Sequence, residues 1–268
     1  MHGPLIVHYQ TMEILIGLTA CLVSLLTFFS GFGLGTILLP LFGVYFELPV
    51  AVLLTALVHL CNNLFKLMLV IRNIHVNTLF KFLAYAVPAG ILGAYLLSIF
   101  DSRFILSSYA LYGKLFHIKP VNLTLGLLMV LFGIWELVPR LSALSLPAKW
   151  FPLGAMFSGF FGGLSGHQGA FRSVVLRRSG LTKEAFIATG VAIACVIDVV
   201  RIPFYWPQAH VLNTANWLSH FLAALTGALL GAFIGNRWLK KTSLQLLHWV
   251  LGCTLAVFGM LYALGIMA

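Results

Sequence analysis

The chain has 268 residues, of which 61% are hydrophobic and only 8% are charged, and its mean hydropathy is +1.03. A soluble globule of this size needs many more charged residues to cover its surface, so the composition excludes that class and predicts an integral membrane protein. The formal net charge of +10 does not indicate a nucleic-acid partner. The basic residues are divided among short loops, where they act first as topology signals.

Apolar stretches with the length of a membrane helix, roughly 20 residues, recur along the chain. In chain order the sequence predicts a glycine-broken element at 12–45, helices at 49–70, 79–100 and 121–138, a second glycine-broken element at 149–177, and helices at 182–204, 214–236 and 244–266. The predicted fold is an all-α polytopic membrane protein with eight membrane elements. No Lys or Arg precedes the first apolar stretch, so we expect that stretch to be retained rather than removed as a signal peptide.

An internal duplication is predicted when the sequence is shifted against itself by 135 residues. The shift brings similar residues together in order, namely Ser30-Gly31 with Ser165-Gly166, Asn63 with Asp198, and Lys66 with Arg201. Such duplication is common in transporters. We therefore expect a first transmembrane repeat over 1–139 and a second over 140–268, each with a broken element followed by three helices.

The orientation of the repeats depends on whether each broken element crosses the bilayer or enters and returns as a hairpin. Counting Lys and Arg gives nine against three in both cases, so the positive-inside rule does not decide. The limbs at 150–161 and 170–178 each have about half the length of a span, which favours re-entrant hairpins. In either case neither tail carries Lys or Arg, and we expect both termini on the non-cytoplasmic side of the cell's inner membrane.

The two glycine-rich breaks are the predicted substrate site. Because lipid supplies no water to freed backbone groups, a break persists only where protein buries it or where it lines a cavity. The helix that restarts after each break would direct N–H groups and a positive dipole end at an anion. The candidate backbone residues are Gly31, Gly33 and Gly35 in the first break, and Gly166 and Gly169 in the second. Close helix packing is the alternative role of membrane glycines, and we expect it at Gly90, Gly93, Gly227 and Gly231.

Three side chains in the second break suit an oxyanion. His167 and Gln168 can donate hydrogen bonds, and His167 can also take up a proton near neutral pH. Arg172 can bind an oxyanion with two parallel bonds while keeping its charge. The alternative for Arg172 is snorkelling toward lipid headgroups.

Two further pairs lie in the helices that follow the breaks. Asp198 and Arg201 are three residues apart and can neutralise each other as an ion pair. Asn63 and Lys66 hold the matched positions in the first repeat. We expect Asn63, Lys66 and Arg201 to belong to the substrate site, where Lys66 with Arg201 adds positive potential to a central cavity. The alternative for Lys66 is snorkelling. Asp198 is the one acid that we expect deep enough to carry a coupling proton, because the others fall near element ends: Glu13, Glu47, Asp101, Glu136 and Glu184.

The sequence does not indicate catalysis. It holds no nucleophile and base at motif spacing, no HExxH and no Walker motif, and the four cysteines lack CxxC spacing and adjacent His ligands. We therefore expect no catalytic residue, no metal and no cofactor.

The breaks read Gly31-Phe32-Gly33-Leu34-Gly35 and Gly162-Gly163-Leu164-Ser165-Gly166-His167-Gln168-Gly169-Ala170, and with them essentially the whole chain resembles the TauE/SafE sulfite exporter family. The chain departs from the common family pattern at His167-Gln168 and at Phe171-Arg172-Ser173. The resemblance implies a secondary transporter that exports a small sulfur-containing anion, sulfite or a sulfonate such as sulfoacetate, with proton coupling as an option. The alternative is an anion-selective channel for small oxyanions or carboxylates. Expected partners are the anionic substrate and membrane lipids, with the protein a monomer or a homodimer.

Overall fold

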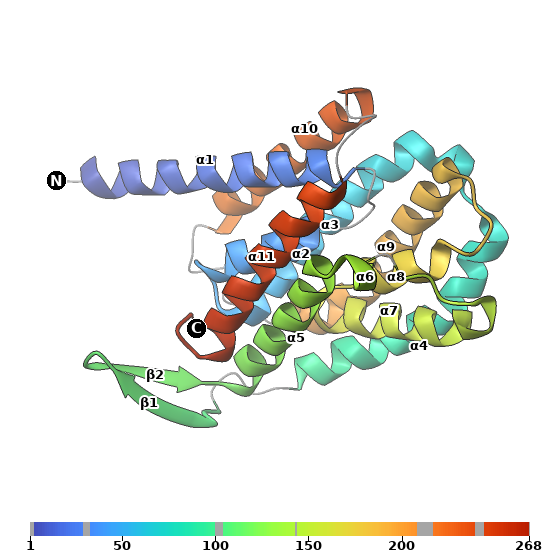
Figure 1. The fold of residues 1–268 in the computed structure, drawn as a ribbon. Helices are drawn as coiled ribbons and strands as arrows, with labels where there is room; N and C mark the ends of the chain where they lie inside the picture. The colour runs from blue at the N-terminus through green and yellow to red at the C-terminus, as the bar shows by residue number, and fades with distance from the viewer. Residues whose placement is uncertain are drawn as a thin grey trace.

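The computed structural model describes residues 3–28, 33–99, 104–142, 144–207, 217–238 and 244–267. Helices lie at every predicted span (Figure 1). The main helices are α1 (Gly3–Leu26), α2 (Leu34–Gly43), α3 (Leu48–Val70), α4 (Val76–Ser98), α5 (Pro120–Leu137), α7 (Phe151–Ser165), α8 (Gly169–Leu176), α9 (Lys183–Tyr205), α10 (Trp217–Trp238) and α11 (Leu244–Ala263). Short turns occupy η1 (Ile71–Asn73), α6 (Pro139–Ser142) and η2 (Ala148–Trp150).

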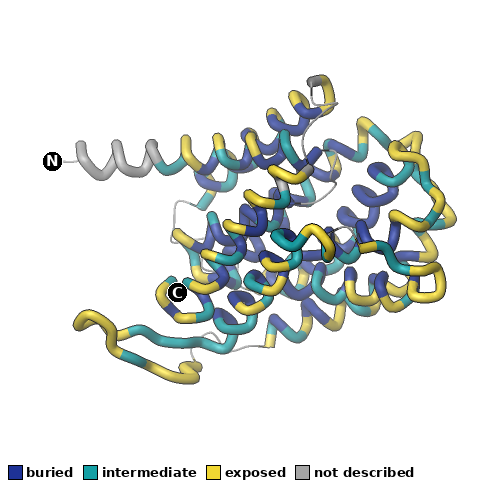
Figure 2. The backbone as a smooth tube through the Cα atoms, viewed as in Figure 1, coloured by how far each residue is buried: buried dark blue, intermediate teal, exposed yellow. Residues whose placement is uncertain are grey.

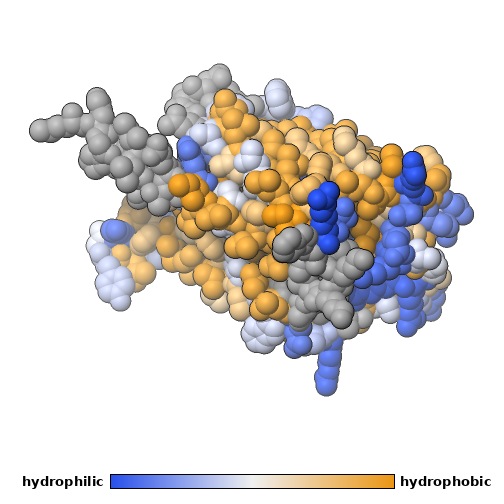
Figure 3. Space-filling view, turned by 90° about the horizontal axis from the view of Figure 1, so that it is seen from above, coloured by the Kyte–Doolittle hydropathy of each residue, from blue (hydrophilic) through white to orange (hydrophobic). Residues whose placement is uncertain are grey.

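Five helices of the described part are long and apolar enough to cross a membrane, namely α3, α4, α5, α9 and α10. Two of them, α3 and α9, are the most buried and form the centre of the bundle (Figure 2). Large apolar side chains such as Leu22, Met68 and Phe80 are exposed on the outside. Apolar residues cover much of the described surface seen from above, and hydrophilic residues gather mainly toward one end (Figure 3). This distribution suits a surface surrounded by lipid.

The predicted repeats interlock rather than stand apart. In the described residues α1 packs along α10, α3 against α9, α4 along α7 and α5 along α11. Each of these pairs joins a helix before residue 139 to one after it. The two halves of the sequence, divided at residue 139, are therefore not two separate units in space. The internal duplication stays a prediction.

Glycines bring two of these helix pairs into backbone contact. A Cβ on Gly163 or Gly93 would overlap a carbonyl oxygen across the α4–α7 interface, and a Cβ on Gly227 or Gly231 would overlap one across the α1–α10 interface. Only a hydrogen atom fits at these positions. The packing role expected for Gly90, Gly93, Gly227 and Gly231 is confirmed, since Gly90 supplies the carbonyl that faces Gly163.

In the part of the chain that the structure describes, one β-hairpin interrupts the helices, and the sequence did not predict it. Strands β1 (Ser107–Leu111) and β2 (Lys114–Ile118) pair antiparallel around Tyr112 and Gly113, which both have positive φ, 49° and 74°. Two successive positive φ values match the tight turn whose twist suits a hairpin. The Tyr109 hydroxyl donates to the Leu264 carbonyl at 2.7 Å, so the hairpin lies beside the end of α11.

Candidate functional site

The second break reverses the direction of the chain. Helix α7 ends at Ser165, Gly166 adopts a left-handed conformation with φ 83°, and α8 starts at Gly169. The end of α8 returns beside the start of α7, where Val175 packs against Gly154. The Ser158 hydroxyl donates to the Gln168 carbonyl at 2.9 Å and so ties the two limbs together at the turn. The polar stretch thus lies at the tip of a helical hairpin.

The first break also turns the chain back. Gly33 precedes α2 with a φ of 118°, and the Tyr45 hydroxyl beyond the end of α2 donates to the Met12 sulfur at 2.9 Å. Gly35 packs against His59, because a Cβ there would lie 3.3 Å from the imidazole Cδ2. Gly31 falls outside the described residues.

A buried polar cluster joins α3 to α9 beside these turns. Asp198 is fully buried and accepts from His59 at 2.6 Å and from the Arg201 Nε at 2.9 Å. With its Nδ1–H donated to the carboxylate, His59 can accept at Nε2, where the Asn63 amide lies 3.2 Å away. The ion pair predicted between Asp198 and Arg201 is present at 2.8 Å.

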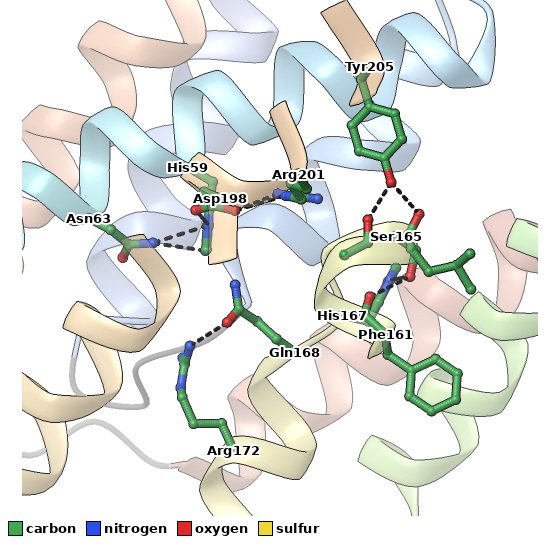
Figure 4. Close-up of polar contacts among 12 residues, drawn as sticks. His59, Asn63, Phe161, Ser165, His167, Gln168, Arg172, Asp198, Arg201 and Tyr205 are labelled. Atoms are coloured by element: carbon green, nitrogen blue, oxygen red, sulfur yellow. Dashed lines mark hydrogen bonds and ion pairs between the residues drawn. The ribbon is translucent and has the colours of Figure 1, made fainter. Parts of the chain in front are cut away.

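The tip of the second hairpin meets this cluster. A Cβ on Gly166 would lie 2.6 Å from the Arg201 Nη1, so the guanidinium lies directly against the turn. The Gln168 amide oxygen accepts from the Arg172 Nη1 at 3.2 Å, and in Figure 4 the Gln168 side chain lies between Arg172 and the His59–Asp198 pair. The predicted residues Gly166, Gln168, Arg172 and Arg201 therefore come together in one place.

Two buried donors at this place, Gln168 Nε2 and Arg201 Nη1, lack a hydrogen-bond partner among the described residues. The His167 Nε2 has no partner among them either; it carries no proton, because the Nδ1–H donates to the Ser165 hydroxyl, which itself donates to the Phe161 carbonyl. These three residues are 0 to 3% exposed. The Asn62 amide nitrogen on α3 is also unpaired within the described part of the chain, and its amide oxygen accepts from Ser24 on α1. An unmade hydrogen bond on a buried donor costs about 1–3 kcal/mol. Unpaired buried donors gathered around a break form an arrangement that an oxyanion can satisfy.

The two remaining predicted cations are buried rather than snorkelling. Arg172 is 3% exposed and Lys66 is 4% exposed, so neither reaches the surface of the protein. The Lys66 ammonium lies 5.5 Å from the centroid of the Phe28 ring, and its charge interacts with that of Arg172. Both cations thus add positive potential to the protein interior.

A small hollow opens where the two broken elements meet. It is lined by the starts of α2 and α8 together with side chains from α5 and α11: Thr36, Phe132, Glu136, His167, Gly169, Ala170 and Leu255. Its volume is about 10 Å³, close to the least that one water molecule needs. His167 stacks on Phe132 with ring centroids 5.1 Å apart, and its Nδ1 lies 2.9 Å from the Ser165 hydroxyl. Gly169 therefore lies with His167 on the wall of this hollow.

A family model described as "Sulfite exporter TauE/SafE" matches residues 16–262. The match covers nearly the whole chain, including both breaks and the central cluster. The chain belongs to the TauE/SafE sulfite exporter family. No curated protein and no solved structure matches the chain.

Membership in the TauE/SafE family makes the chain a multi-pass membrane protein of a family of transporters rather than enzymes. The family match covers the site but does not assign roles to its residues, so the predicted roles stay predictions. Among the described residues, no group of three His, Cys, Asp or Glu side chains is placed to hold a metal ion.

Sequence reasoning missed three polar residues of this region, namely His59, Asn62 and Glu136. The signal for His59 was available, because it precedes Asn63 by four residues on an apolar helix and therefore shares its face. Glu136 does lie near a helix end, as expected, but it is only 6% exposed. Glu136 is therefore a second buried acid, and the proton-coupling role expected for Asp198 stays a prediction.

Proposed function

We propose that this protein is a secondary transporter that exports a small sulfur-containing anion, sulfite or a sulfonate such as sulfoacetate, through the site between its two broken elements. The observation that carries the proposal is the set of unpaired donors at the tip of the second hairpin. Gln168 and Arg201 each direct a buried N–H group that lacks a hydrogen-bond acceptor among the described residues. With the buried Arg172 guanidinium that donates to Gln168, these two groups match the several acceptor oxygens of a sulfur oxyanion.

The charges near the site support an anionic substrate. Lys66, Arg172 and Arg201 bring three positive charges, and Asp198 brings one negative charge that pairs with Arg201. Burying a charge without a counterion is costly in a low-dielectric interior. A bound anion would supply negative charge beside Arg172 and Lys66, and the N-terminal ends of α2 and α8 would add their dipoles.

Movement of the scaffold is part of the proposal. The hollow beside His167 has barely the space that one water molecule needs, which is too small for a sulfonate. An anion therefore enters only when the elements around the hollow shift. Hairpins that start from opposite ends of the bundle suit alternating access, in which one repeat moves against the other around a fixed site.

The fold supports the hairpin form of the predicted topology. With both broken elements turning back, α3, α5, α8 and α10 all end toward the same end of the bundle (Figure 1). Among the described residues that end carries Arg72, Lys81, Arg140, Lys149, Arg177, Arg178, Lys183 and Arg237, against Lys114 and Lys119 at the other. We assign the richer end to the cytoplasm of the inner membrane, which puts both termini outside.

Counterflow in proteoliposomes tests the function directly. Vesicles loaded with unlabelled sulfite or sulfoacetate should accumulate the labelled anion, with saturation as its concentration rises. Arg172→Met and His167→Ala should each lower the rate at least tenfold, because the first removes a charged donor and the second removes the ring that lines the hollow and stacks on Phe132. Arg178→Met is the matched control, since Arg178 is an exposed arginine that donates to the Ser145 hydroxyl outside the site.

The same assay separates a carrier from a channel. A carrier saturates and exchanges, whereas a channel conducts without saturation and shows no counterflow. Unchanged counterflow in both the Arg172 and the His167 variants would refute the proposed site. Conductive flux without exchange would replace the transporter with the channel.

A further inference from the structure

A second, partly buried ion pair lies outside the cluster of Asp198. Glu136, in the last turn of α5, pairs with the Nδ1 of His248 near the start of α11. Their side chains are 6% and 16% exposed. The two helices are close here, because a Cβ on Gly133 would lie 2.9 Å from the Gly252 carbonyl oxygen. The pair thus connects the two predicted repeats at a point where their backbones nearly touch.

The same carboxylate lines the hollow beside the proposed anion site. Glu136 shares that hollow with His167 and Gly169, and Phe132, one turn earlier on the same face of α5, stacks on the His167 ring. An ionised carboxylate at this position repels an anion that enters the hollow, and the repulsion is strong because little water screens it. The hollow therefore brings the N-terminal end of α8, which favours an anion, together with one acid that opposes it.

We propose that the Glu136–His248 pair is the proton-binding site that couples anion passage to proton movement, an inference that rests on the proposed function. With one proton the pair is neutral overall, whether the proton resides on the carboxylate or on the imidazole. Without that proton the pair carries one negative charge into the hollow. The anion enters when the pair holds the proton, and both leave on the other side, so one proton accompanies each anion.

The charged and titratable groups that face Glu136 are consistent with this role. His248 approaches from α11, His167 from the break and Arg177 from the end of α8, where its charge interacts with Glu136. Arg177 is fixed near the surface by donating to the Leu144 carbonyl at 3.3 Å. The pair thus lies between the anion donors and the basic end of the bundle, where a proton can be exchanged.

Asp198 is less suited to the role that the sequence suggested for it. Its two oxygens accept from His59 and from Arg201, and it is fully buried. Protonation would remove the counterion of a buried arginine. Asp198 is better explained as the fixed anchor that holds Arg201 against Gly166.

The test uses proteoliposomes with the purified full-length protein and sulfoacetate, because its sulfonate and carboxylate stay ionised around neutral pH. Labelled sulfoacetate reports anion flux, and a trapped pH-sensitive dye reports proton flux. In the unmodified protein, net anion influx should acidify the lumen. In Glu136→Gln the proton influx per anion should fall at least tenfold, while counterflow stays measurable and loses its pH dependence.

Two variants complete the experiment. Glu184→Gln removes an exposed acid at the start of α9 and should leave both fluxes unchanged. His248→Gln removes the basic partner but keeps the carboxylate, so coupling should persist with its pH profile shifted to lower pH. An unchanged proton-to-anion ratio in Glu136→Gln would overturn the proposal.

The possible failures are distinguishable. Absence of counterflow in the unmodified protein would refute the proposed function itself. If Glu136→Gln does not fold and shows no counterflow, the His248→Gln pH profile decides. A profile identical to that of the unmodified protein would overturn the coupling role, and a shifted profile would support it.

Discussion

The two broken elements share a backbone shape but differ in chemistry. Each turns the chain back and restarts a short buried helix after a glycine with positive φ, Gly33 in one and Gly166 in the other. At the 135-residue offset Gly33 matches Gln168, and Ile37 matches Arg172. The first break therefore presents an apolar helix where the second presents hydrogen-bond donors.

This difference shows that a pocket between similar hairpins can take its polarity from one of them. The start of α2 contributes a helix end and Thr36 to the hollow, while its residues Leu34, Leu38 and Leu39 pack into the core. The polar contribution of the first repeat comes instead from α3, through His59 and Asn63. Substitutions in the second hairpin and its partners should consequently cost far more activity than those in the first.

The largest effect is expected from Arg201→Met. The variant removes a proposed anion donor and leaves the buried Asp198 without its arginine partner, a loss that costs about 3–5 kcal/mol. Counterflow should disappear, and the thermal unfolding temperature in detergent should fall markedly. The double variant Asp198→Asn with Arg201→Met removes both charges and should regain most of the stability without regaining transport. Recovery of counterflow in the double variant would show that Arg201 has only a structural role.

The next largest effect is expected from Gly166→Ala. An alanine in the left-handed conformation costs about 1–2 kcal/mol, and its Cβ would also press on the Arg201 guanidinium 2.6 Å away. Transport should fall more than tenfold. Gly180→Ala is the matched control, because Gly180 also has a positive φ, 68°, but a Cβ there meets nothing within 4 Å. Equal transport losses in the two variants would mean that backbone strain, rather than the contact with Arg201, is responsible.

A moderate effect is expected from Gln168→Ala. The amide donates toward the proposed anion and accepts from Arg172 at 3.2 Å, and a hydrogen bond to a charged group contributes about 1.5–3 kcal/mol. The apparent affinity for the anion should therefore fall about tenfold to a hundredfold. Saturation curves for counterflow measure this change. An affinity within twofold of the unmodified protein would remove Gln168 from the site.

The smallest effect is expected in the first break, from Thr36→Val. This substitution keeps the shape of the side chain and removes its hydroxyl from the hollow. Because the first hairpin is proposed to act through its backbone, the counterflow rate should stay within about threefold. A loss as large as that of Gln168→Ala would contradict the asymmetry between the two hairpins.

Most of the helical architecture could be predicted from the sequence, because apolar length and glycine breaks are local signals. The β-hairpin escaped because its strands are only five residues long and its turn is Tyr112-Gly113 rather than a common turn pair. The pairing of His59 with Asp198 joins residues 139 positions apart, and no local pattern reveals such a contact. Burial of Lys66, Arg172 and Glu136 likewise depends on how α3, α5 and α8 pack, which position along a helix does not determine.

The glycine contacts between α1 and α10 and between α4 and α7 have a mechanical consequence. Where backbone faces backbone, no interdigitated side chains have to change rotamer before one helix slides along its neighbour. These two interfaces lie on either side of the central α3–α9 pair. The bundle therefore contains two interfaces along which groups of helices can shear, while the charged cluster between them keeps its shape.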